Sequence, residues 1–98
     1  MTERYPSAVE LRQIRNWNND YEAMMKWIES LWAYRDFGWR KKGHTYYVST
    51  AGWSGNEEII QAMKEAKNWF WNQCWYQSTQ GGHYVFKVKN YLVEKKNQ

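Results

Sequence analysis

Few residues in this chain are of the types that carry acid–base, nucleophilic or metal chemistry. The two histidines, His44 and His83, each lie beside glycine, and the one cysteine, Cys74, lies within an aromatic segment. No nucleophile has a base at activating distance in the sequence, and no His/Cys pattern has metal-site spacing. An acid–base pair would need the fold to bring His83 to Glu57 or Glu58, which the sequence leaves open. We therefore expect a non-enzymatic protein with no catalytic residue, metal or cofactor.

The stretch with the most definite local geometry is residues 45–60. It is typical of a strand, a glycine-bracketed loop and a helix start, a corner whose free N–H groups and helix dipole favour an anion. Glu57 and Glu58 oppose a phosphate there, because two carboxylates already complement the dipole. A Ser54–Glu57 capping box would also satisfy the first N–H groups. We interpret the loop as a rigid corner that holds Trp53 outward, with a ligand contact through ring and amide as the alternative.

The composition favours a binding surface. Eight Trp, eight Tyr and three Phe stand among 98 residues, and each such ring can bury about 150–250 Å². A small interior cannot hold them all, so some rings should lie at the surface, where they mark contact sites. The predicted ligand- or partner-binding residues are Trp53, Ser54, Asn56, Trp75, His83 and Tyr84. A basic and aromatic patch is predicted from Trp39, Arg40, Lys41, Lys42, Lys87 and Lys89.

Charge and targeting signals restrict the kinds of partner that we expect the protein to bind. The formal net charge of +4 permits an anionic partner without requiring one. No apolar run approaches the roughly 20 residues of a membrane span, and residues 1–6 lack the apolar region expected of a signal peptide. A single cysteine excludes an internal disulfide. We expect a soluble, cytoplasmic protein that binds a protein, a nucleotide-type ligand or nucleic acid, and no membrane.

One domain is expected over residues 1–98, beginning with a helical segment at 7–34. A Ser7–Glu10 capping box starts it, and apolar residues follow at heptad-like intervals from Leu11 to Trp32. Two interpretations fit: one long helix, or two helices broken near residues 16–20, with Asn19 or Asp20 as the second cap. The apolar stripe over residues 11–32 would be core, or would join copies in a homo-oligomer.

The remaining residues predict a β-α-β-β core over 45–89 and a polar tail over 90–98. A basic connector at 35–44 leads to a strand at 45–50 and a helix that starts at the Ser54 corner. A strand at 69–77, a Gly-Gly hairpin turn at 78–82 and a strand at 83–89 follow. The predicted fold is α+β: an N-terminal helix or helix pair, then a small, three-stranded, mostly antiparallel sheet with a helix on one face.

Two sequence words resemble a known family. The first is YVSTAGWSGNEEII at residues 47–60, and the second combines Trp71, Trp75 and Ser78 with GGHYVF at 81–86. Over residues 45–88 the chain is similar to a family of small, largely uncharacterised phage and prophage proteins. The resemblance implies a phage-encoded accessory protein in a bacterial host cytoplasm, and it implies no enzyme activity. By analogy, such proteins often counter host defences by binding a protein or a nucleotide signal.

The sequence therefore supports three functional hypotheses. The leading one is a non-catalytic phage accessory protein that antagonises a bacterial defence, sequestering or blocking a host protein or nucleotide signal through an aromatic, mildly basic surface. The first alternative is a single-stranded nucleic-acid or nucleotide-binding protein that uses the hairpin Trp and Lys residues. The second is a structural or oligomeric phage protein that assembles through residues 11–32.

Overall fold

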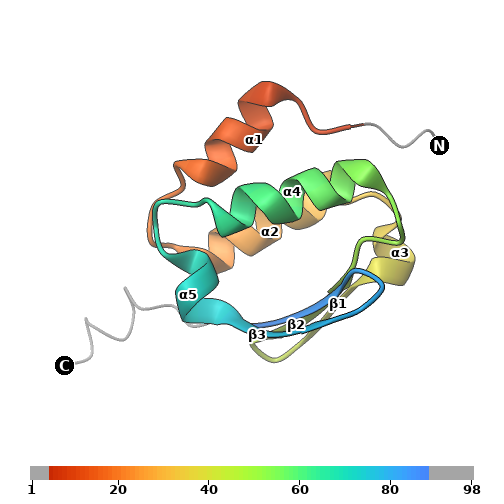
Figure 1. Cartoon of the computed structure of the whole chain (residues 1–98). Helices are drawn as coiled ribbons and strands as arrows, with labels where there is room; N and C mark the ends of the chain where they lie inside the picture. Colours follow the sequence, from red (N-terminus) through yellow and green to blue (C-terminus); the bar gives the residue numbers. More distant parts are fainter. Residues whose placement is uncertain (1–4, 89–98) are drawn as a thin grey trace.

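A computed structural model describes residues 5–88 as four antiparallel strands with helices on one face (Figure 1). The elements are α1 (Ala8–Arg15), α2 (Tyr21–Leu31), α3 (Arg35–Gly38), β1 (Trp39–Lys42), β2 (Thr45–Ser49), α4 (Ser54–Lys64), α5 (Phe70–Cys74), β3 (Trp75–Thr79) and β4 (His83–Lys87). The strand order is β1-β2-β4-β3, and each neighbouring pair is antiparallel. The α+β class with N-terminal helices is confirmed, although the predicted sheet had three strands.

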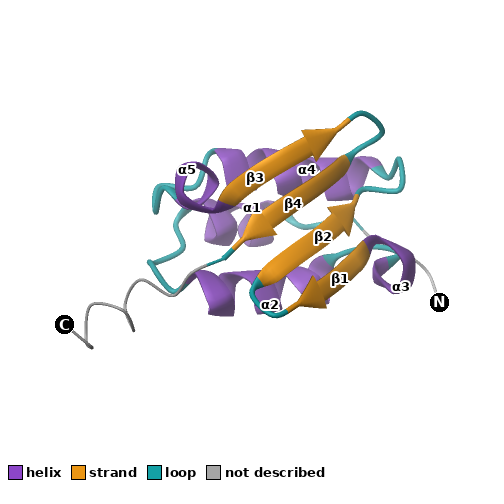
Figure 2. Cartoon of the chain, turned by 90° about the horizontal axis from the view of Figure 1, so that it is seen from below, coloured by secondary structure: helices purple, strands orange, loops and turns teal. Residues whose placement is uncertain are grey.

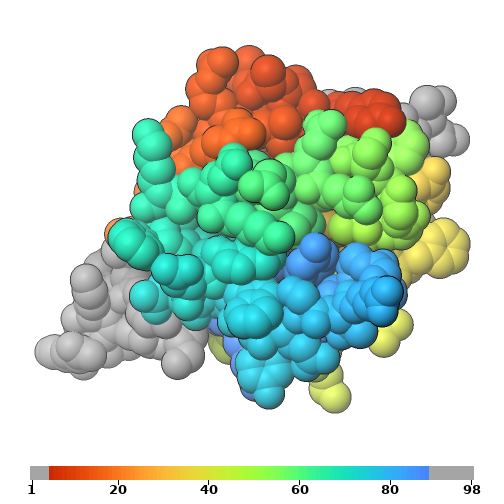
Figure 3. Space-filling view, viewed as in Figure 1, coloured from red at the N-terminus to blue at the C-terminus, as the bar shows by residue number. Residues whose placement is uncertain are grey.

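The helices form two layers above the sheet. Helices α2 and α4 lie side by side on the sheet (Figures 1 and 2), and α1 packs on α4 from the outside (Figures 1 and 3). The opposite face of the sheet is covered by no described element, and Figure 2 looks directly onto it. We call it the open face. The predicted tail at 90–98 lies outside the described residues.

The N-terminal segment is a pair of helices, which resolves the alternative left open by the sequence. Ser7 and Glu10 form the predicted capping box at the start of α1. Asp20 caps α2, because its carboxylate accepts a hydrogen bond from the Ala23 N–H at 3.1 Å. Between the caps, Asn18 and its neighbours leave the helical conformation. Local side-chain hydrogen bonds of this kind compete with a continuous helix.

The apolar stripe of this segment lies inside the protein itself. Helix α2 contributes Tyr21, Met24, Met25 and Ile28 to a core in which Ile28 has no exposed surface. The core consists of Ile14, Tyr21, Met24, Met25, Ile28, Trp32, Tyr46, Val48, Ile59, Ile60, Ala62, Met63, Phe70, Cys74, Phe86 and Val88. Most of the stripe that the sequence offered for a homo-oligomer through residues 11–32 is therefore core, while Leu11, Trp27 and Leu31 remain partly exposed.

The connector at 35–44 contains an unpredicted strand. Strand β1 pairs with β2 so that Trp39 stands opposite Val48 and faces the helices, while Arg40 and Lys42 face outward. Gly43, with φ of 63°, makes the tight turn into β2. One inward-facing ring and three basic residues suit a short edge strand, because charge on an edge protects it from pairing with another chain.

The predicted strand at 69–77 begins instead as a helical turn. The Asn68 side chain accepts a hydrogen bond from the Phe70 N–H at 2.9 Å, and Trp69 takes a left-handed φ of 65°. Helix α5 then places Phe70 and Cys74, four residues apart, in the core. The strand starts only at Trp75. Aromatic β-propensity misled the sequence prediction here, because the local cap and the four-residue burial period decide the conformation.

Candidate functional site

The open face is built from alternate residues of the strands. Tyr46, Val48 and Phe86 point to the helices and are buried, so their neighbours point outward. Pairing extends this assignment across the sheet: Tyr47 stands opposite Arg40 on one side and Val85 on the other. The open-face side chains are Arg40, Lys42, Thr45, Tyr47, Ser49, Tyr76, Gln77, Thr79, His83, Val85 and Lys87.

This face is cationic without opposing charge. Strands β1 to β4 contain no Asp or Glu. Arg40, Lys42 and Lys87 are exposed, and the Lys87 ammonium lies 3.9 Å from the centroid of the Tyr76 ring. A cation over an aromatic face at this distance favours a fixed arrangement of both groups. The open face can therefore offer positive charge and flat rings to the same ligand.

A shallow depression of about 350 Å³ lies at the α3 end of this face. Its lining is Phe37, Gly38, Arg40, Tyr47, Val48, Ser49, His83, Tyr84 and Val85. Phe37 is 86% exposed on the short helix α3. Gly38 lets that helix approach β2, because a Cβ atom there would overlap the Ser49 carbonyl oxygen. The glycine thus brings the Phe37 ring near the open face.

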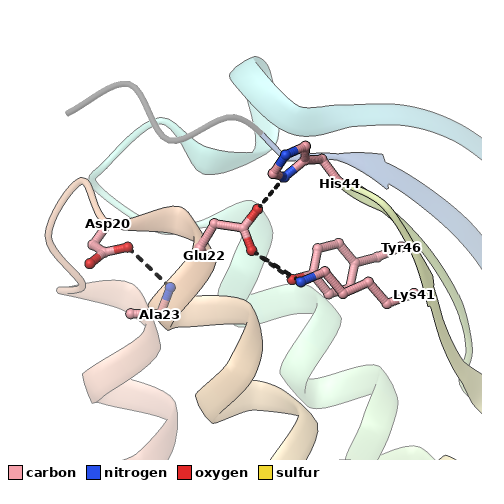
Figure 4. Close-up of polar contacts among 6 residues, drawn as sticks. All are labelled: Asp20, Glu22, Ala23, Lys41, His44 and Tyr46. Atoms are coloured by element: carbon pink, nitrogen blue, oxygen red, sulfur yellow. Dashed lines mark hydrogen bonds and ion pairs between the residues drawn. The ribbon is translucent and has the colours of Figure 1, made fainter. Parts of the chain in front are cut away.

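Polar contacts with helix α2 hold the β1–β2 hairpin on the helix side of the sheet. Glu22 of α2 accepts a hydrogen bond from the Tyr46 hydroxyl at 3.0 Å and lies 3.0 Å from His44 Nδ1 (Figure 4). The Lys41 ammonium is 3.6 Å from the same carboxylate. One helix side chain therefore holds three residues of the hairpin, Lys41, His44 and Tyr46. We call these four residues the Glu22 cluster.

Contacts within the Glu22 cluster change the pKa values of Glu22 and Tyr46. Burial alone raises the pKa of the Glu22 carboxyl, but hydrogen bonds to His44 and Tyr46 and the charge of Lys41 outweigh it and hold the pKa below its ordinary value. Burial and the hydrogen bond to Glu22 raise the pKa of the Tyr46 hydroxyl. Both shifts favour the pair found here, an ionised carboxylate that accepts from a neutral phenol. The cluster is thus an anchor at neutral pH.

Two of the predicted binding residues, Trp53 and Asn56, lie in the structural corner instead of on a free surface. Asn56 is 1% exposed; its amide nitrogen donates to the Ala33 and Thr50 carbonyls, and its amide oxygen accepts from the Ala33 N–H. Trp53 is half-buried and stacks on Tyr5 at 4.8 Å between ring centroids. The expectation that the corner holds Trp53 outward is therefore wrong.

The capping box predicted at this corner is also wrong. Helix α4 begins at Ser54, with Trp53 in the cap position and no side-chain cap hydrogen bond. The Ser54 hydroxyl instead donates to the Tyr5 hydroxyl at 3.1 Å. The Trp53 ring packs closely on Gly55, where an added Cβ atom would lie 2.6 Å from the indole nitrogen. Aromatic packing, and not a capping box, fixes this helix start.

The remaining predicted residues divide between the two faces of the sheet. His83, Arg40, Lys42 and Lys87 lie on the open face. The other described ones, Trp39, Lys41, Trp75 and Tyr84, lie on the helix side. Trp39 contacts Trp32 and Tyr46, so it is not the exposed ring expected beside the basic run. Lys89 lies outside the described residues.

The acid–base pairing left open by the sequence finds no support in the arrangement. His83 lies on the open face, whereas Glu57 and Glu58 belong to α4 on the other side of the sheet. Within residues 5–88, no group of three or more His, Cys, Asp or Glu side chains is arranged to hold a metal ion. The same residues include no helix of the length and apolarity that crossing a bilayer requires.

The predicted site residues include none of the exposed rings on or beside the open face. Tyr47 is 45% exposed, Tyr76 55% and Phe37 86%. The signal for Tyr47 was present, because alternation already separated Thr45, Tyr47 and Ser49 from Tyr46 and Val48. What the sequence lacked was any indication of which set the helices would cover.

The chain matches no protein-family model, no curated protein and no solved structure. The site is therefore defined by its geometry: an antiparallel sheet face with exposed rings and cations, on which residues 5–88 place neither a covering element nor a carboxylate of the strands.

Proposed function

We propose that this protein binds single-stranded nucleic acid on the open face of its sheet. The observation that carries the proposal is the exposed pair of rings, Tyr47 and Tyr76, set among Arg40, Lys42 and Lys87 on strands without any carboxylate. Rings stack on bases whatever their sequence, and cations follow the phosphate backbone. Such a face attracts anionic ligands and repels cationic ones.

The dimensions of the sheet suit a short segment of unpaired strand. Four strands spaced about 4.8 Å apart place β1 about 14 Å from β3. Sheets of this width in RNA-binding modules stack two or three bases. Tyr47 near the centre, Tyr76 at the β3 edge and Phe37 beside the depression provide rings for that number of bases. A duplex offers no exposed base faces to these rings.

Fluorescence anisotropy with a labelled oligonucleotide tests the proposal. Three open-face cations predict a slope of about −2 for log K against log salt with a single strand, at about −0.7 per phosphate contact. Arg40→Ala should reduce that slope by about 0.7, and Tyr47→Ala should weaken binding by about 1–3 kcal/mol while Tyr47→Phe retains it. Arg12→Ala on α1 removes the same charge on the far side of the molecule and serves as the matched control.

Two results would refute this function. One is the absence of binding to any oligonucleotide at low salt. The other is an equal loss of affinity in Arg40→Ala and Arg12→Ala, which would mean that only the net charge attracts the ligand. Tighter binding of duplex than of single strand would exclude the stacking role of Tyr47 and Tyr76.

The phage resemblance supplies a context that we also propose: an accessory protein that sequesters a nucleic acid or nucleotide signal of the host's defence. It is supported by the two sequence words, although Trp53, Gly55 and Asn56 within them make internal contacts. A phage growth assay on hosts with and without the defence tests this context. Loss of protection in Arg40→Ala but not in Arg12→Ala is expected, and equal protection by both variants would remove it.

A further inference from the structure

A second depression, of about 320 Å³, lies where α4 ends and α5 begins. It is lined by Lys64, Ala66, Lys67, Trp69, Trp71 and Asn72. None of these side chains is acidic, and both lysines are exposed. The Lys64 ammonium lies 5.3 Å from the centroid of the Trp71 ring. Rings and unopposed cations therefore meet here as they do on the open face.

Trp69 in this depression is a residue that folding does not explain. It is 67% exposed and holds a φ of 65°, a conformation that costs any residue with a Cβ atom. The corner itself is fixed by Asn68. Its backbone carbonyl accepts a hydrogen bond from the Tyr21 hydroxyl, and its side-chain amide donates one to the Asn18 backbone carbonyl. Glycine at position 69 would fit this backbone with less strain. A large, exposed ring at such a position is consistent with a contact outside the chain.

The second depression is connected to the open face around the free edge of β3. Trp71 stacks on Trp75, with centroids 6.4 Å apart and planes 16° from parallel, and Trp75 is 43% exposed. The next residue, Tyr76, lies on the open face beneath Lys87. The strand register shifts between Trp75 and Gln77, so these positions are placed by their contacts. Trp75 pairs with the buried Phe86 on the helix side, whereas Tyr76 lies under Lys87 on the open face, so one edge strand presents rings on both sides. Strand β3 is exposed along its whole length.

We propose that the bound single strand continues past Tyr76, turns around the edge of β3, and places a base on Trp69 with its phosphates at Lys64 and Lys67. This inference rests on the proposed function and extends it. The open face would hold the first two or three bases, and Trp75 and Trp69 would hold those that follow. Charge complementarity selects an anionic polymer, and the series of separate rings selects one that carries unpaired bases.

The test is a length series of labelled oligonucleotides, from about three nucleotides, which the sheet face alone can hold, to about eight. Affinity should rise with length beyond the sheet-face segment. Trp69→Gly, which suits the backbone at this position, should lower affinity for the octanucleotide about tenfold and leave the trinucleotide unchanged, since one stacked base contributes about that much. Trp69→Phe should restore most of the loss. Tyr47→Ala should weaken both lengths.

The outcomes distinguish a failure of the second subsite from a failure of the proposed function. If the trinucleotide binds but Trp69→Gly leaves the octanucleotide unaffected, the second subsite is wrong and the open-face site stands. If affinity does not rise with length, the path around β3 is wrong. If neither length binds, the proposed function fails and this inference fails with it. Lys67→Ala against Arg12→Ala provides the matched charge comparison, with a loss for the octanucleotide expected only in the first.

Discussion

Replacing Glu22 by Gln should destabilise the protein at neutral pH and have little effect in acid. The substitution keeps the size of the side chain and an oxygen that can accept from the Tyr46 hydroxyl, but it removes the negative charge. That charge is the only group that holds α2 to the β1–β2 hairpin through Lys41, His44 and Tyr46 together within the described residues (Figure 4). The perturbation is therefore confined to one electrostatic anchor.

The contacts set the expected magnitude. The Glu22 side chain is 24% exposed, and its partner Tyr46 is 3% exposed. A hydrogen bond to a charged group contributes about 1.5–3 kcal/mol, of which a neutral amide acceptor retains a part. His44 and Lys41 have side chains 78% and 48% exposed, so solvent reduces each of their contributions to about 0–1 kcal/mol. Together these values predict a loss of about 1–2 kcal/mol at pH 7.

The pH dependence follows from the direction of the pKa shift. The pKa of Glu22 is lower in the folded protein than in the unfolded chain, so the ionised carboxylate stabilises the fold. That contribution is complete above the unfolded-state value of about 4.3 and is lost as the pH falls below it through the lower folded-state value. The stability difference between the wild type and Glu22→Gln should thus be largest near neutrality and should shrink towards pH 3 or below.

Urea unfolding, followed by tryptophan fluorescence and circular dichroism at both pH values, measures this difference. Glu58→Gln, an exposed charge change on α4, is the matched control and should stay within about 0.5 kcal/mol of the wild type at either pH. Equal destabilisation by Glu22→Gln at pH 7 and pH 3 would refute the electrostatic account. So would an unchanged midpoint at pH 7, because the anchor would then contribute nothing.

Four further substitutions test the fold around the site, each by thermal or urea unfolding. Asn56→Ala should cost roughly 3 kcal/mol, because it leaves the Ala33 N–H and buried carbonyls without partners; a loss under about 1 kcal/mol would contradict the buried role. Gly82→Ala should cost about 1–3 kcal/mol, since φ is 82° and the new Cβ would overlap the Thr50 hydroxyl. Trp69→Gly should stay within about 1 kcal/mol of the wild type, whereas Trp71→Gly, which removes a ring packed on Tyr84 and Phe86, should cost several.

The caps of α1 and α2 could be predicted because their signals are local. Ser7, Glu10 and Asp20 each act within three residues of their own position, and the structure confirms all three. The alternation of β2 was equally readable, since Tyr46 and Val48 lie on one face. Segments decided by short-range chemistry are therefore well described by their sequence.

The sequence prediction failed where distant contacts or competing local signals decide the outcome. The run from Trp69 to Tyr76 has strong β-propensity, yet Asn68 and the burial of Phe70 with Cys74 impose a helical turn first. The spacing of four residues between Phe70 and Cys74 was visible, but so was an alternating pattern. Strand β1 was missed because a single inward ring, Trp39, gives too little alternation to recognise.

The candidate site was only partly predictable for a related reason. Both faces of the sheet carry aromatic residues, so ring content cannot tell the covered face from the open one. Trp53 and Asn56 looked available because a glycine loop suggests an accessible corner. Their contacts with Tyr5 and Ala33 come from segments more than twenty residues away in the chain. Only tertiary packing distinguishes such a structural corner from a ligand site.

The distribution of the rings explains why so aromatic a chain still has a free surface. Most indoles serve the interior: Trp32 and Trp39 pack together, and Trp71 packs on Phe86. The exposed rings on the open face are phenols, Tyr47 and Tyr76, which tolerate water at one end.

Two indoles are exposed as well: Trp75 in the edge strand β3 and Trp69 ahead of helix α5. If all exposed rings were merely surplus to the core, they would be expected at random among acidic and basic neighbours. Instead the rings of the sheet and its edge share their surfaces with Lys and Arg, while Glu22 and Glu65 are engaged in ion pairs elsewhere. That separation of charge, more than the number of rings, favours a polyanion over a protein as the partner of this surface.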